Sequence, residues 1–161
     1  MKYTYLLCVL ILLFSCQPSQ KKSDTSKTLA TEKQEVKETL LYPKEYIATN
    51  FDFPVGKPNA KGYYNAQKFG MNFHLGEDWN GVGGGNSDLG DTIYSVANGY
   101  VKFAKDVGHG WGNIIRINHK LPNDNMIESF YAHCDTMFVK PKTWIKKGTP
   151  IGTIGTAHGA W

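Results

Sequence analysis

The chain has 161 residues, 41% of them hydrophobic and 20% charged, which is enough for one ordinary domain with a core of its own. Its formal net charge of +4 is mild, and the basic residues are scattered along the chain, so the composition argues against a nucleic-acid-binding surface. An aromatic content of 13% together with 17 glycines predicts short strands joined by tight turns rather than a helical bundle.

The start of the chain predicts an export signal. An apolar run from Tyr5 to Phe14 would span roughly 15 Å as a helix, about half of the hydrocarbon core of a bilayer. It is too short to cross a membrane and has the length of a signal-peptide core. The segment Leu13 to Cys16 resembles the lipobox of bacterial lipoproteins, in which the signal is cleaved before a cysteine that becomes lipidated. The alternative is an ordinary secretory signal with an incidental cysteine.

These features predict an exported lipoprotein whose signal is residues 1–16. The lipid on Cys16 would anchor it to a bacterial membrane, facing the periplasm or the cell exterior. Residues 17–45 contain too few apolar side chains to offset their ordering entropy and predict a flexible tether, with a short helix over residues 31–41 as an alternative. Because Cys8 is lost with the signal, Cys134 would remain alone and no disulfide framework is expected.

Residues 46–161 predict one folded all-β domain. Short apolar and polar alternations are separated by glycine, proline and asparagine turns, and no clear helical period occurs. The Asn98-Gly99 pair is a strong hairpin signal and predicts that the strands on its two sides pair with each other. We therefore expect antiparallel sheets of short strands in a sandwich or barrel. The expected strands are 51–55, 91–97, 100–105, 113–119, 126–134 and a short one within 145–155.

His74 and Asp78 form the first candidate metal site. Imidazole and carboxylate groups bind zinc at about 2.1 Å, whereas a straight strand would hold these two residues about 13 Å apart. The pair can share one metal ion only if the segment bends sharply, and Gly76 between them permits such a bend. His133, near the end of the expected strand 126–134, is the second candidate; taken alone, it is a half-buried histidine at a strand end.

Five segments, taken in order, resemble the lysostaphin-type (LytM-like) zinc metallopeptidases, which cleave peptide bonds in peptidoglycan. The patterns are His-x-x-x-Asp, A-x-G-x-V, a G-x-G-N turn with a strand ending in His, Y-x-H, and K-x-G-x-x-I-G-x-x-G. They match residues 74–78, 97–101, 110–119, 131–133 and 146–155. The resemblance implies an all-β fold of the duplicated-hybrid-motif type, with antiparallel sheets that form an open-ended groove, and a peptidase domain over residues 46–161.

The resemblance also implies a function. His74 and Asp78 would be ligands of Zn²⁺, and His133 would be the active-site histidine that handles a zinc-activated water or steadies the developing charge. The substrates would be peptidoglycan peptides. The third ligand of the family is the second His of a His-x-His motif, which would lie beyond Trp161. We therefore expect either a fragment of a longer reading frame or a metal-poor protein.

Two other functions fit part of the pattern. A regulator would have the same fold without a working zinc site, and would bind the wall or activate another wall hydrolase. A lipoyl- or biotinyl-type carrier is suggested by residues 147–152, but it lacks the Met-Lys or Asp-Lys tip and leaves His74 and Asp78 unexplained. We expect His119 to be structural, and His109 to be an exposed loop histidine, with a place along a substrate groove as the alternative.

Overall fold

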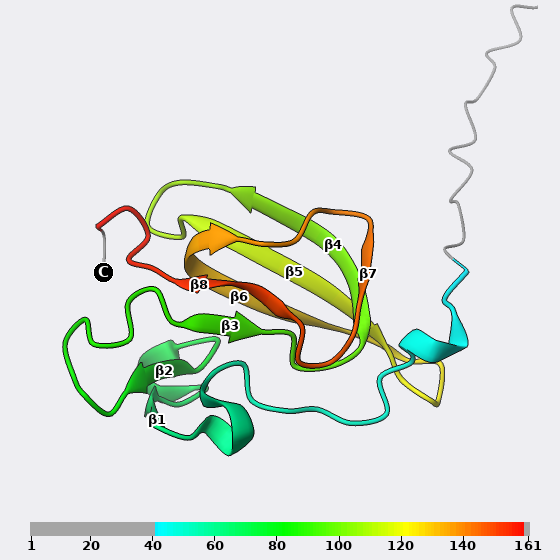
Figure 1. The fold of residues 1–161 in the computed structure, drawn as a ribbon, viewed down its shortest axis with the longest axis horizontal. Coiled ribbons are helices and arrows are strands. Elements are labelled where there is room, and N and C mark those ends of the chain that lie inside the picture. Colours follow the sequence, from blue (N-terminus) through cyan, green and yellow to red (C-terminus); the bar gives the residue numbers. More distant parts are fainter. Residues whose placement is uncertain (1–40, 160–161) are drawn as a thin grey trace, which may run out of the picture. The chain divides into compact units, whose positions relative to one another are not determined.

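The computed structural model describes residues 41–159, which belong to one compact unit, Thr39–Trp161. This part of the chain folds into two antiparallel β-sheets with three short helical turns (Figure 1), which confirms the predicted all-β class. None of the helical turns described is long and apolar enough to cross a membrane. The elements in chain order are η1 (Lys44–Tyr46), η2 (Gly56–Ala60), β1 (Tyr63–Gln67), η3 (Met71–Phe73), β2 (Asp78–Gly81), β3 (Thr92–Tyr94), β4 (Gly99–Asp106), β5 (Asn113–Lys120), β6 (Met126–Met137), β7 (Thr143–Ile145) and β8 (Pro150–Ile154).

The predicted signal over residues 1–16, including Cys16, lies outside the described residues, as does most of the predicted tether over residues 17–45. The helix considered for residues 31–41 also falls almost entirely outside them. The division into signal, tether and domain therefore stays a prediction.

The larger sheet carries the core. Its six strands lie in the order β3-β8-β6-β5-β4-β7, and each neighbouring pair is antiparallel. The smaller sheet is the β1–β2 pair. Aliphatic side chains from five strands pack together with a tyrosine and a cysteine, and burying each large apolar side chain contributes about 1.5–3 kcal/mol. The buried cluster is Ile93, Val101, Ile115, Ile117, Tyr131, Cys134, Ile145 and Ile151.

Strand β5 shows why this sequence forms a sheet. Successive side chains of a strand point to opposite faces, and Ile115, Ile117 and His119 at alternate positions are all fully buried. β-Branched isoleucines suit such a half-buried, pleated surface. The predicted strand 113–119 is thus confirmed, and its alternation places a histidine on the same face as the core isoleucines.

The predicted hairpin at Asn98-Gly99 is wrong. β3 pairs with β8, whereas β4 pairs with β5 and β7, so the two strands that flank the dipeptide lie apart in the sheet. Strand β3 also ends at Tyr94, short of the predicted residue 97. Neither Asn98 nor Gly99 has a positive φ, although the usual Asn-Gly hairpin turn requires it at both positions.

Tertiary contacts explain why this dipeptide does not form the turn. The side chain of Asn98 donates to the carbonyls of Glu45 and Ile47 and accepts from the backbone N–H of Lys147. Gly99 is buried, and a Cβ there would lie 2.6 Å from the carbonyl oxygen of Asn118. Asn98 thus joins its own segment to two others by hydrogen bonds, and Gly99 allows strand β4 to pack closely against β5.

Substituting Gly99 by alanine tests this packing role. The added methyl group would also lie 2.8 Å from Nδ1 of His119, so the neighbouring strand has to move. We expect G99A to lower the free energy of unfolding by about 1–3 kcal/mol, the usual cost of overpacking. Urea unfolding followed by circular dichroism measures it. A midpoint equal to that of the wild type would contradict the close-packing explanation.

The predicted strand over residues 51–55 is also wrong. No regular strand forms there, although Asp52 N–H donates to the carbonyl of Val96, and Tyr94 N–H donates to the carbonyl of Pro54. Pro54 has no N–H of its own to donate to a ladder. The segment therefore runs beside the β3 region with single hydrogen bonds in place of a continuous ladder.

Candidate active site

The bend that a shared metal ion would require between His74 and Asp78 is present in the structure. The short turn η3 ends at Phe73, the chain bends at Leu75 and Gly76, and β2 begins at Asp78. The backbone N–H of His74 donates to the carbonyl of Met71, which fixes where the bend starts. The imidazole Nε2 of His74 thereby comes to 3.5 Å from the carboxylate Oδ1 of Asp78.

This separation fits two ligands of one zinc ion. Bonds of about 2.1 Å in tetrahedral geometry place two ligand atoms roughly 3.4 Å apart, close to the 3.5 Å between the two side chains. The other ring nitrogen of His74, Nδ1, is buried without a hydrogen-bond partner among the described residues. A metal-binding histidine usually donates this second N–H, and residues 41–159 do not supply the acceptor.

His133 lies at an irregularity in strand β6. Asn113 pairs with Cys134 while Ile115 pairs with Tyr131, so β6 carries one more residue than β5 between these two pairs. Such a bulge bends the strand and re-aims a side chain. His133 itself has a φ of 58°, which is uncommon for a residue other than glycine and costs about 1–3 kcal/mol. A strained residue of this kind is typical of functional sites.

The electrostatics of His133 place it with the His74–Asp78 pair. Burial is the main effect and lowers the pKa of the His133 imidazole. The carboxylate of Asp78 raises this pKa, and so do hydrogen bonds with the backbone of Gly110 and Trp111. His74 has the smallest effect and lowers it. Because Coulombic effects fall off with distance, the influence of Asp78 and His74 on this pKa indicates that His133 lies in their neighbourhood. With its pKa below the ordinary 6.5, His133 is neutral at pH 7 and can accept a proton.

The predicted glycine-rich bend between β4 and β5 supports His133. The backbone N–H of His133 donates to the carbonyl of Trp111 at 3.0 Å. The indole of Trp111 lies nearly parallel to the imidazole, with an interplanar angle of 5° and ring centroids 6.1 Å apart. Trp111 was not among the site residues predicted from the sequence, although its position inside the G-x-G-N pattern pointed to it.

The part of the chain that the structure describes offers no third candidate ligand to His74 and Asp78. Between residues 41 and 159, no group of three or more His, Cys, Asp or Glu side chains is placed to hold a metal ion. His158 contacts Asp106 instead, with Nε2 3.1 Å from Oδ2. His109 is exposed in the bend, in agreement with the expectation of an exposed loop histidine.

The remaining candidates are structural. His119 is fully buried and hydrogen-bonded on both ring nitrogens, as the sequence led us to expect. Cys134 is 3% exposed, and burial raises the pKa of its thiol to about 11. A thiol of this kind stays protonated at neutral pH and is a poor nucleophile.

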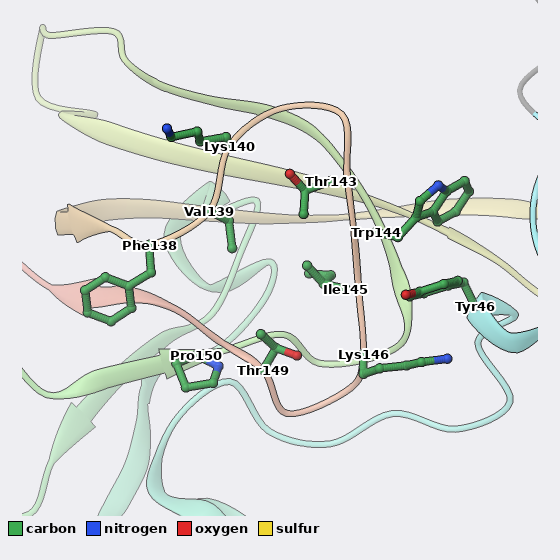
Figure 2. Close-up of a pocket in the computed structure, with 10 residues that line it drawn as sticks. All are labelled: Tyr46, Phe138, Val139, Lys140, Thr143, Trp144, Ile145, Lys146, Thr149 and Pro150. Atoms are coloured by element: carbon green, nitrogen blue, oxygen red, sulfur yellow. The ribbon is translucent and has the colours of Figure 1, made fainter.

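A separate pocket of about 490 Å³ lies around β7 (Figure 2). Tyr46, Trp144 and Ile145 contribute to its walls, with Lys140 and Lys146 among the other residues that line it. The residues that line this pocket do not include His74, Asp78 or His133. It is therefore distinct from the candidate site.

The His74–Asp78 pair has the ligand spacing of zinc, which is compatible with a metal-binding protein. Residues 73–160 match Peptidase family M23, and the chain belongs to this family. The matched region contains all three predicted site residues. This confirms the lysostaphin-type resemblance of the five sequence segments.

Several proteins of known name are similar to this chain over part of their length. "Lipoprotein NlpD" of Yersinia enterocolitica is 40% identical over 67 residues, which cover 42% of this chain and 65% of that protein. "Murein hydrolase activator NlpD" of Escherichia coli (strain K12) is 38% identical over 79 residues, 45% of this chain and 20% of that protein. The chain thus spans less than two thirds of either relative.

Two further matches are an uncharacterised lipoprotein and a solved structure. "Uncharacterized lipoprotein YgeR" of Escherichia coli (strain K12) is 34% identical over 83 residues, 48% of this chain and 32% of that protein. A crystal structure of a zinc-containing peptidase from Vibrio cholerae is 22% identical with a TM-score of 0.47, covering 68% of this chain and 33% of that one.

Proposed function

We propose that the chain is the peptidase domain of a zinc-dependent endopeptidase that hydrolyses peptide bonds in bacterial peptidoglycan. The observation that carries this proposal is the 3.5 Å approach of His74 Nε2 to Asp78 Oδ1, beside a histidine whose pKa is lowered. Membership of Peptidase family M23 supports the class of reaction. The wall as substrate is supported by the sequence resemblance and by the name of the similar murein hydrolase activator.

In this function His74 and Asp78 would hold the metal, and a bound zinc ion would polarise the scissile carbonyl and lower the pKa of water. His133 is neutral near pH 7, so it can take a proton from the attacking water as a general base. Its N–H can instead donate to the oxygen on which negative charge develops. Its backbone hydrogen bond with Trp111 helps to keep the residue at the site during either step.

We further propose that the domain works at the cell envelope. Residues 1–16 would be the export signal, Cys16 the lipidated residue, residues 17–45 the tether, and residues 46–161 the peptidase domain. A lipid on Cys16 would hold the domain to a membrane that faces the periplasm or the cell exterior. The names of the similar lipoproteins support this arrangement.

A second candidate function is regulation of another wall hydrolase. Two observations favour it: one similar protein is named a murein hydrolase activator, and the described residues lack a third metal ligand. In this function the same surface would bind the wall or a partner hydrolase without cleaving peptides itself.

Zinc content and cleavage of purified wall separate the two functions. The protein as expressed from its gene is expected to bind zinc stoichiometrically and to release peptides that mass spectrometry detects. Asp78→Asn removes the charge of a proposed ligand and is expected to weaken zinc binding strongly and to abolish cleavage. His109→Ala is the control, since His109 is exposed and is not one of the proposed site residues. Wild-type protein without zinc and without cleavage would decide for the regulator.

A further inference from the structure

The indole of Trp111 is unusually placed for a large apolar side chain. Trp111 is 53% exposed, so it contributes little to the core, yet its ring makes contacts with two other rings. It lies nearly parallel to His133, and Phe130 meets it edge-on at 5.5 Å with an interplanar angle of 89°. Ring pairs in these two geometries attract each other by about 0.5–1.5 kcal/mol beyond simple burial.

The backbone around Trp111 is tied down by short turns. Trp111 N–H donates to the carbonyl of Gly108 at 3.0 Å, and Val107 N–H donates to the carbonyl of Gly112 at 3.0 Å. The side chain of Asn113, which follows the bend, donates to the carbonyls of Cys134 and Asp135 in β6. The loop that carries the indole is therefore hydrogen-bonded to strand β6 at the two residues that follow His133.

His133 requires such support because its own strand does not provide it. The residue lies at the bulge, where the ladder between β5 and β6 is interrupted, and its φ of 58° is held against strain. A regular strand would fix the direction of the side chain through its pleat. At the bulge, contacts outside the ladder have to do so: the hydrogen bonds with the backbone of Gly110 and Trp111, and the stacking of the Trp111 indole.

From this geometry we infer that Trp111 is a positioning residue: its indole stacks on the imidazole of His133 and fixes the orientation of that ring. The contribution to catalysis rests on the proposed peptidase function, whereas the fixing of the ring does not. A catalytic histidine must come within hydrogen-bond distance of the proton that it transfers. Misplacing such a group by 1 Å lowers the reaction rate by as much as about 10²-fold.

The test compares W111A with W111F, because phenylalanine keeps an aromatic face and alanine removes it. F138A is the matched control: Phe138 is 54% exposed, like Trp111, but lines the separate pocket. The first measurement is the set of three-bond NMR couplings across χ1 of His133. We expect one rotamer in the wild type, W111F and F138A, and averaged rotamers in W111A. A single rotamer in W111A would overturn the inference.

The second measurement is the kinetics of wall-peptide cleavage, with stability followed in parallel. We expect W111A to lower kcat by about 10- to 100-fold, with little change in KM and nearly unchanged stability. W111F is expected to keep most of the wild-type kcat. An unchanged kcat in W111A, or a loss that W111F does not restore, would overturn the positioning role. If the wild type does not cleave, the peptidase function fails, and the couplings decide the positioning of His133 by themselves.

Discussion

Replacing His133 by alanine is expected to lower the rate of wall-peptide cleavage by about 10²- to 10⁴-fold, the range that a positioned acid–base group contributes. The half-buried imidazole is neutral at pH 7, since burial lowers its pKa below the ordinary value. It is therefore ready to accept a proton beside the His74–Asp78 pair. Steady-state cleavage of purified wall peptides measures the effect, and zinc content is expected to stay unchanged because His133 is not a proposed ligand.

Two companion variants sharpen this prediction. His133→Gln keeps an N–H donor but removes the basic nitrogen. A rate close to that of the alanine variant is expected for a general base, whereas a largely restored rate would assign His133 to oxyanion stabilisation. His109→Ala is the matched control, since His109 is also a histidine with a left-handed φ, 51°, in the neighbouring bend. Equal rates for wild type and H133A would contradict any direct role of His133.

The close approach of His74 to Asp78 could be anticipated from sequence because its geometry depends on five consecutive residues. The chemistry of His74 and Asp78 requires a bend, Gly76 permits one, and the structure contains it. The alternating isoleucines of β5 were predictable for the same reason, because the period of two is a local property of a strand. Both inferences needed no knowledge of what lies far away in the chain.

The Asn98-Gly99 dipeptide shows where local reasoning fails. Its composition favours a two-residue hairpin turn, but its groups are used by partners distant in sequence: the carbonyls of Glu45 and Ile47, the N–H of Lys147 and the ring of His119. Each such hydrogen bond contributes about 0.5–1.5 kcal/mol net, and together they outweigh the local preference for a turn. A pattern over two residues cannot contain that information.

The support of His133 lies beyond sequence reasoning for a related reason. The bulge at His133 is a property of the register between β5 and β6, and it appears only when both strands are paired. The stacking of Trp111 follows from that bulge together with the conformation of the glycine bend. The sequence pattern indicated which segments meet, while the directions of the side chains required the structure.

The largest effect on stability is expected from His119→Ala. His119 is fully buried, with Nδ1 2.8 Å from the carbonyl oxygen of Asn98 and Nε2 2.7 Å from Oγ of Ser129. A carbonyl only accepts, so Nδ1 carries the proton and Nε2 accepts from the serine hydroxyl. That hydroxyl lies 3.1 Å from the buried hydroxyl of Tyr131, which in turn accepts from Val96 N–H. Alanine would leave a cavity and unpaired buried groups, at a cost of about 3–5 kcal/mol.

The destabilisation caused by this substitution is expected to depend on pH, with a sign that follows from the pKa of His119. Burial lowers this pKa in the folded protein, against the opposing effects of the Asn98 carbonyl and of Glu128, while the unfolded chain keeps a value of about 6.5. As the pH falls below about 6.5, the unfolded chain binds a proton that the folded chain does not, so the wild type loses stability until the pH passes the folded pKa.

His119→Ala removes this contribution, so its destabilisation should be largest at pH 7.5 and smaller at pH 5.5. Urea unfolding at both pH values measures the two differences. His133 has a lowered pKa as well, so part of the acid sensitivity remains in the variant. An equal destabilisation at both pH values would show that the folded protein takes up the proton on His119 as readily as the unfolded chain does. The buried network would then tolerate a charged ring, against the burial and hydrogen bonding from which the prediction follows.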